Sequence, residues 1–128
     1  PANDPEHWDL IEGQGSLLHP SFAGVTLGLI HGAQPDALVL CHEPTRTHMR
    51  GLPKQPMPSI AETMELCLKT ARLTNKAARF VGVSINSSRL APDAAEKYLK
   101  ELEAKLALPV VDSLRTGVVR IVDRLLKA

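Results

Sequence analysis

The stretch "FVGVSIN", Phe80–Asn86, decides the fold class, because it is short, apolar and partly β-branched, with its polar residues near the end. A run of this kind is typical of a strand that is buried on both faces of a parallel sheet. Three other runs share this character: "WDLIE" at Trp8–Glu12, "ALVLC" at Ala37–Cys41 and "PVVD" at Pro109–Asp112. We therefore predict four short strands.

Helices are predicted in the intervals between these strands. The clearest begins at Ser59, which is followed three residues later by Glu62 in the pattern of a capping box. The predicted helices are Ser21–Ile30, Ser59–Thr74, Pro92–Leu106 and Gly117–Lys127. Strands that alternate with helices indicate an α/β fold with a parallel sheet flanked by helices.

The segment Glu43–Pro58 breaks this alternation. It carries four prolines together with the cationic residues Arg46, His48, Arg50 and Lys54. We expect a long polar loop with a functional role, because structureless loops of this length are uncommon in compact domains.

Composition and charge exclude several classes of protein. A length of 128 residues with 44% hydrophobic and 23% charged residues suits one globular domain. The formal net charge is +1 and aromatic residues make up 3%, which argues against a nucleic-acid partner. No run approaches the roughly 18 apolar residues of a membrane span. We expect a cytoplasmic protein in which Cys41 and Cys67 remain thiols.

Polar residues follow each of the four predicted strands. In an open parallel sheet, ligands bind beyond the carboxyl ends of the strands, so these residues are expected to face one rim. They are Glu12, Gln14, Ser16 and His19 after the first strand, His42, Glu43 and Arg46 after the second, Asn86, Ser87 and Ser88 after the third, and Asp112 and Arg115 after the fourth.

A structural interpretation of these residues stays open beside the functional one. Gln14 and Ser16 have the chemistry of helix caps, and Asn86 that of a turn former. Arg115 is close enough in sequence to pair with Asp112. Further alternatives are that Glu12 is a solvated strand end, that His31 is a cation at a helix C-terminus, and that His48 and Arg50 are solvated.

Motifs for other chemistries are lacking in the sequence. The gaps between His19, His31, His42 and His48 are 12, 11 and 6 residues, which do not match the short paired spacings of structural zinc sites. No G-x-S-x-G, G-x-G-x-x-G or G-x-x-x-x-G-K-[S/T] sequence is present.

The stretch "EGQGSLLHPSFAGVTLGLIHGAQPDALVLCHEPTR", which begins at Glu12, closely resembles a bacterial family long catalogued as of unknown function. The resemblance continues through "VGVSIN" and "LPVVDSLRTG" and so covers nearly the whole chain. It implies the C-terminal portion of a P-loop NTPase-like (Rossmann-like) three-layer domain. Some members are D-glutamate N-acetyltransferases, which act with acetyl-CoA in the breakdown of D-amino acids.

A more distant resemblance is to P-loop enzymes of the dethiobiotin-synthetase type. In those enzymes a strand that ends in Glu-Gly assists the Mg²⁺ site, and Glu12-Gly13 matches that position. A later strand ends in an Asn that binds the base of the nucleotide, and Asn86 matches that Asn. This resemblance implies a role for ATP and Mg²⁺, with Glu12 as the metal ligand.

The phosphate loop of the family and its N-terminal Rossmann-like domain would lie upstream of residue 1. We therefore expect residues 1–128 to be a single α/β domain fragment. Its apolar edges and faces are expected to be covered by self-association or by the missing N-terminal part.

Three functions remain open from the sequence. The first is the C-terminal part of a D-amino-acid N-acetyltransferase, the second an ATP-dependent ligase or kinase, and the third a non-enzymatic nucleotide-binding domain. For the first, the catalytic candidates are Glu12, His19 and His42, and the substrate-binding candidates are Gln14, Ser16, His31, Arg46 and Arg115. Gly13, Gly15 and Asn86 are the candidates for binding a cofactor.

Overall fold

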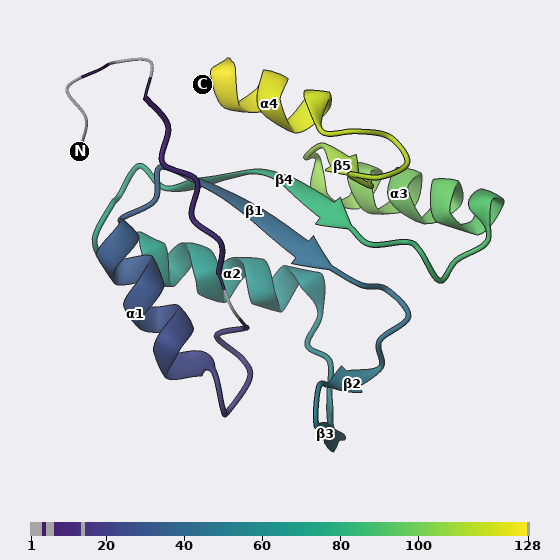
Figure 1. The fold of residues 1–128 in the computed structure, drawn as a ribbon, viewed down its shortest axis with the longest axis horizontal. Coiled ribbons are helices and arrows are strands. Elements are labelled where there is room, and N and C mark those ends of the chain that lie inside the picture. The colour runs from purple at the N-terminus through teal and green to yellow at the C-terminus, as the bar shows by residue number, and fades with distance from the viewer. Residues whose placement is uncertain (1–3, 5–6, 14, 128) are drawn as a thin grey trace.

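Three parallel strands form the centre of the chain in the computed structural model, which describes residues 4, 7–13 and 15–127 (Figure 1). The strands are β1 (Ala37–His42), β4 (Arg79–Ile85) and β5 (Val110–Val111), in the spatial order β1-β4-β5. A separate antiparallel hairpin consists of β2 (His48–Met49) and β3 (Leu52–Pro56). The helices are α1 (Ala23–Ala33), α2 (Ile60–Ala71), α3 (Pro92–Leu106) and α4 (Val119–Leu126).

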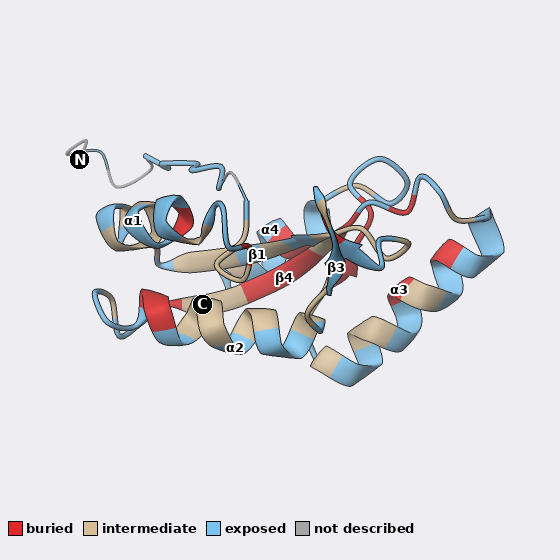
Figure 2. Ribbon diagram, turned by 90° about the horizontal axis from the view of Figure 1, so that it is seen from below, coloured by how far each residue is buried: buried red, intermediate tan, exposed pale blue. Residues whose placement is uncertain are grey.

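Helices cover both faces of the parallel sheet, as the alternation of elements predicts. Figure 2 shows α2 and α3 on one side of β1 and β4, and α1 on the other. Val83 and Ile85 of β4 pack with Leu99 of α3, and Met64 of α2 lies against this cluster. Ile121 of α4 packs with Val81 on the opposite face. The predicted three-layer arrangement is therefore present.

A bulge in β4 places Val81 in a different core cluster from Val83 and Ile85. The β1–β4 register pairs Leu38 with Phe80 and then Val39 with Gly82, so Val81 is an extra residue in β4. At Gly82 the helix α4 comes so close that an added Cβ would lie 2.6 Å from Ile121 Cγ1. Glycine is needed here for close packing of α4 on the sheet.

The helix boundaries follow local signals in the sequence. Helix α3 spans the predicted residues, and the predicted capping box of α2 is confirmed. In this box, Ser59 Oγ accepts the Glu62 N–H, and Glu62 Oε2 accepts the Ser59 N–H. Helix α1 begins two residues later than predicted and continues to Ala33, where Gln34 ends it in the left-handed region at φ 48°.

Two sequence predictions are corrected by the structure. The run Trp8–Glu12 does not form a strand, although its composition suits one. A strand needs a hydrogen-bonded partner, and β1 pairs only with β4 in the part of the chain that the structure describes. The segment 43–58 is not a featureless loop, because Gly51 at φ +76° turns the chain back to form the β2–β3 hairpin.

None of the helices in the described ranges is long and apolar enough to cross a membrane. Cys41 and Cys67 are both free thiols. Burial, and secondly the charge of Glu12, raise the pKa of the Cys41 thiol.

Candidate functional site

The carboxyl ends of the three parallel strands meet at one rim, as the sequence predicts. The Asn86 N–H after β4 donates to the His42 carbonyl at the end of β1, over 2.8 Å. The Ser87 N–H donates to Asp112 Oδ2 after β5, over 3.1 Å. Backbone and side-chain bonds therefore join the three strand ends into one surface.

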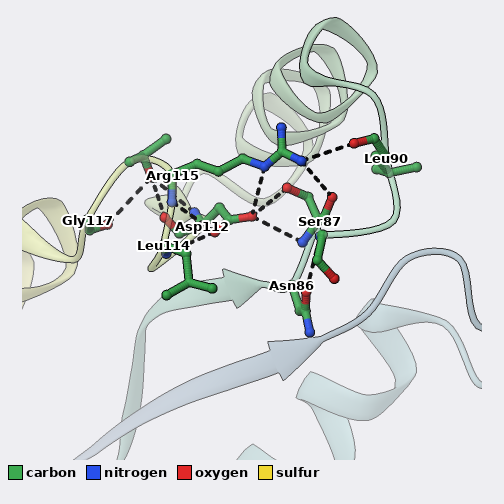
Figure 3. Close-up of polar contacts among 9 residues, drawn as sticks. Asn86, Ser87, Leu90, Asp112, Leu114, Arg115 and Gly117 are labelled. Atoms are coloured by element: carbon green, nitrogen blue, oxygen red, sulfur yellow. Dashed lines mark hydrogen bonds and ion pairs between the residues drawn. The ribbon is translucent and has the colours of Figure 1, made fainter.

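The Asp112 carboxylate is the anchor of this rim (Figure 3). Its Oδ2 accepts hydrogen bonds from the N–H and the hydroxyl of Ser87. Its Oδ1 accepts the N–H groups of Leu114 and Arg115, at 3.0 and 3.1 Å. Burial raises the pKa of this carboxyl, but the four hydrogen bonds outweigh burial and hold the pKa below its ordinary value.

The Arg115 guanidinium binds the backbone that follows β4. Its Nη2 donates to the carbonyls of Ser87 and Leu90, at 3.2 and 3.0 Å. Its Nε lies 3.9 Å from Asp112 Oδ2, which is the local pair considered from the sequence. This geometry fixes the turn at residues 87–90, and substrate binding by Arg115 stays a prediction.

Asn86 closes a turn at the same place. Its Oδ1 accepts the N–H of Ser88 over 3.1 Å, which is the turn-forming role considered from the sequence. The amide nitrogen of Asn86 points away from the Asp112 cluster in Figure 3. It is the group that would bind a nucleotide base, and that role of Asn86 stays a prediction.

His42 ends β1 at the rim and is partly buried. Side chains alternate along a strand, so His42 shares a face of β1 with Leu40, which packs against the main core cluster. Burial lowers the pKa of the His42 imidazole, the nearby Glu43 raises it, and Arg46 lowers it, with a net lowering. A neutral imidazole at neutral pH is suited to accept a proton.

A hollow of about 460 Å³ lies next to these strand ends. Glu43 follows β1, and its Oε1 accepts both the N–H and the hydroxyl of Thr45. These bonds from Thr45 lower the pKa of the Glu43 carboxyl. Its Oε2 lies 4.0 Å from Arg46 Nε. The hollow is lined by Glu43, Thr45, Arg46, Thr47, His48, Arg50, Gly51 and Arg89.

Three basic residues of this hollow, His48, Arg50 and Arg89, are not among the predicted site residues. His48 and Arg50 were interpreted as solvated, and Arg89 was not considered. Arg89 is the fourth residue after β4, directly beyond the polar residues that were considered. Extending the rim by one residue would have included it. Arg50 was missed because the turn of the hairpin, which places it beside the strand ends, was not predicted.

His19 is buried, and the backbone engages both of its ring nitrogens. Nε2 lies 2.9 Å from the Arg50 carbonyl, and Nδ1 lies 3.2 Å from the Ser21 nitrogen. These contacts fit a ring that donates from Nε2 and accepts at Nδ1. They attach the loop before α1 to the β2–β3 hairpin, and a catalytic role for His19 stays a prediction.

The chain bends at Gly15 and turns at Ser16–Leu18, before α1 begins. Gly15 has φ +103°, and an added Cβ would lie 2.7 Å from Phe22 Cβ. Ser16 Oγ accepts the Leu18 N–H over 3.1 Å, so Ser16 caps this turn rather than α1, which begins later. Gln14 lies outside the described residues. Glu12 is close enough to raise the pKa of the Cys41 thiol in β1.

His31 lies in the last turn of α1, as the helix-end interpretation predicts. Its Nε2 is buried and has no hydrogen-bond partner among the described residues. No three His, Cys, Asp or Glu side chains in the described ranges are grouped as a metal site would require. The metal role of Glu12 therefore stays a prediction without support from a cluster.

A second hollow of about 720 Å³ lies between α3 and the segment after β5. Ala95, Leu99 and Val110 contribute apolar surface to it. An ion pair between Arg120 of α4 and Glu103 of α3 lies at its side. This hollow is mainly apolar, with charged groups of both signs, and offers no concentration of positive charge.

Comparison with known proteins identifies the fold and the relatives. Residues 1–122 match a family model described as a domain of unknown function, the DUF1611 C-terminal P-loop domain. A solved structure of a DUF1611 family protein from Anabaena variabilis superposes with a TM-score of 0.83 and 34% sequence identity. The match covers 91% of this chain and 34% of that protein.

Two curated relatives carry a functional name. A D-glutamate N-acetyltransferase from Tritonibacter scottomollicae is 55% identical over 125 residues, and one from a Pseudoalteromonas species is 50% identical over the same length. Each match covers 98% of this chain but 38% of the relative. The chain therefore spans less than half the length of the proteins that bear this name.

Proposed function

Because the chain belongs to the DUF1611 family and matches its C-terminal P-loop domain, we propose that it is the C-terminal part of an N-acetyltransferase. The proposed reaction moves the acetyl group of acetyl-CoA to the amino group of D-glutamate or a similar D-amino acid. The observation that carries this proposal is the 55% identity to a protein named D-glutamate N-acetyltransferase. A cytoplasmic location is part of the proposal and agrees with the two free thiols.

The reaction requires three things from the protein. The amine must be neutral when its nitrogen attacks the thioester carbon. The amine proton must pass to a base, and the coenzyme A sulfur must leave as the carbon–sulfur bond breaks. Donors must also stabilise the negative charge on the acetyl oxygen of the tetrahedral intermediate.

His42 is the histidine that best fits the role of base. It lies at the rim, and burial lowers the pKa of its imidazole, so the ring is neutral at neutral pH. His19 is less suitable because both ring nitrogens already have backbone partners. His31 lies in α1, away from the strand ends that form the rim.

Arg46 is the proposed partner of the substrate carboxylate. It lies in the loop that follows His42, the last residue of β1, and it lines the 460 Å³ hollow. A guanidinium can bind a carboxylate through two N–H groups. The N–H groups of residues 13–16 are proposed to bind an anion of the acyl donor, as glycine-rich turns do.

The test is transfer of a labelled acetyl group by the full-length protein without ATP. We expect labelled N-acetyl-D-glutamate by mass spectrometry, with turnover reduced about 100-fold or more in His42→Asn, since a general base contributes about this factor. The matched control is His7→Asn, which changes an exposed histidine and should leave turnover unchanged. Absence of transfer together with ATP cleavage to ADP would contradict the proposal and favour the ligase or kinase alternative.

A further inference from the structure

We propose that the 460 Å³ hollow beside the β2–β3 hairpin is an oxyanion-binding site held chiefly by Arg50 and Arg89. Neither arginine is among the site residues predicted from the sequence. The two ligands considered, a carboxylate of the acidic substrate and a phosphate of the acyl donor, are taken from the proposed function. The rest of the proposal does not depend on that function.

The first observation is the charge of the walls. Three arginines, Arg46, Arg50 and Arg89, are among the residues that line the hollow, and Glu43 is the acidic residue among them. Glu43 has one oxygen engaged by Thr45, and its other oxygen lies nearest to Arg46. The hollow therefore has a net positive charge even when His48 is neutral.

The second observation is that two of these arginines form no salt bridge with the residues that the structure describes. Within the described ranges, no carboxylate lies within ion-pair distance of the guanidinium of Arg50 or Arg89. The charge of Arg89 reaches Glu43 from farther away and contributes to lowering the pKa of that carboxyl. Arg50 and Arg89 are exposed and so accessible to a ligand, and Arg46 lies 4.0 Å from Glu43.

The third observation is that the backbone at both arginines is held in place. The Arg50 carbonyl is bound by His19 Nε2, which ties the hairpin to the loop before α1. Arg115 Nη2 binds the carbonyls of Ser87 and Leu90, one on each side of Arg89. A site whose backbone is already ordered loses less conformational entropy when it binds a ligand.

The ligand chemistry follows from the donors. Guanidinium groups bind carboxylate and phosphate oxygens through paired, charge-assisted hydrogen bonds. A hollow of about 460 Å³ is large enough for such a group with part of the molecule that carries it. An uncharged or cationic ligand would leave the arginines uncompensated.

The experiment is calorimetric titration of the full-length protein with three probes. Inorganic phosphate and adenosine 3′,5′-bisphosphate represent the acyl donor, and glutarate represents an acidic substrate without its amine. We expect at least one probe to bind and its affinity to fall about ten-fold or more in Arg50→Gln and in Arg89→Gln, since a charge-assisted hydrogen bond contributes this much. The matched control, Arg124→Gln, removes an exposed arginine of α4 and should leave affinity unchanged.

The pattern of loss identifies the source of the oxyanion. Weakening of the phosphate probes alone assigns the hollow to the acyl donor, and weakening of glutarate alone assigns it to the substrate. Equal affinities in the wild type, both variants and the control, with unchanged melting temperatures, would overturn the site. Because binding is measured without turnover, that result would leave the proposed acetyl transfer standing, whereas loss of acetyl transfer with intact binding would overturn only the function.

Discussion

Polar residues at and near this rim fall into two classes. Some have hydrogen-bonding groups that are engaged within the fold, and others do not. All the strong contacts of Asp112 are made within the fold, as are those of the His19 ring. Arg50 and Arg89 are instead exposed and belong to the residues that line the hollow. The sequence predicted that the ends of β1, β4 and β5 lie together, but the fourth predicted strand end, at Glu12, does not belong to a strand. The sequence could not separate these two classes, because the partners come from distant segments.

Asp112→Asn is expected to destabilise the protein, because every group that contacts this carboxylate is a donor. The amide nitrogen of asparagine would place a donor against the donors of Ser87 or Leu114. We expect a loss of about 2–3 kcal/mol in denaturant unfolding of the full-length protein. Asp123→Asn, at an exposed position of α4, is the matched control.

The pH dependence of this loss can be derived from the lowered pKa of Asp112. The stabilisation is fully present above the ordinary value of 3.8 and is lost as the pH falls through the lower value of the folded state. The difference between wild type and Asp112→Asn should therefore shrink below about pH 4. A difference that is constant from pH 7 to pH 3 would mean that the charge of the carboxylate does not carry the effect.

Gly15→Val is expected to abolish acetyl transfer while most of the fold remains. The residue has φ +103°, and a side chain there would meet Phe22, so the backbone at Gly15 has to change shape. Turnover and circular dichroism of the full-length protein test this. Gly24→Ala in α1, where an added Cβ meets nothing within 4 Å, should behave as wild type. Wild-type kinetics in Gly15→Val would show that the turn serves only as an entry to α1.

At the scale of elements, the strongest signals in the sequence were those with a local cause. The capping box of α2 and the Pro92 start of α3 involve neighbouring residues, and both helices form as predicted. The run Trp8–Glu12 has the composition of a strand but lacks a pairing partner among the described residues. Pairing depends on distant segments, so composition alone misled.

Gly82→Ala tests the packing of α4 on the sheet. The added methyl group would lie 2.6 Å from Ile121 Cγ1 and 3.0 Å from the Pro109 carbonyl, so α4 has to shift. We expect a loss of about 1–3 kcal/mol in the free energy of unfolding of the full-length protein. Gly28→Ala, in the open face of α1, should instead be neutral or slightly stabilising. Equal stability of the two variants would show that α4 does not pack this closely.

At the scale of the whole molecule, apolar side chains remain exposed on several elements. Leu10 and Leu114 are 92% and 90% exposed, and Val119, Val122 and Leu126 form an exposed stripe on α4. The curated relatives are longer, and this chain covers 38% of each. We propose that the rest of the full-length protein, or a second copy, covers these side chains.

Sedimentation of residues 1–128 alone tests this proposal about covering. We expect oligomers or aggregates, because burying exposed apolar surface against other copies is favourable. The double variant Val119→Ser/Val122→Ser should reduce association by removing part of the stripe on α4. A monomer that unfolds cooperatively would show that the chain buries a sufficient core by itself.

The most direct measurement of the central claim is a crystal structure of the full-length protein with N-acetyl-D-glutamate bound. The account predicts that the product lies at the rim formed by β1, β4 and β5. Its carboxylate oxygens should be within hydrogen-bond distance of an arginine of the 460 Å³ hollow, and its amide nitrogen close to His42. A product bound wholly outside this domain, with the rim empty, would contradict the account.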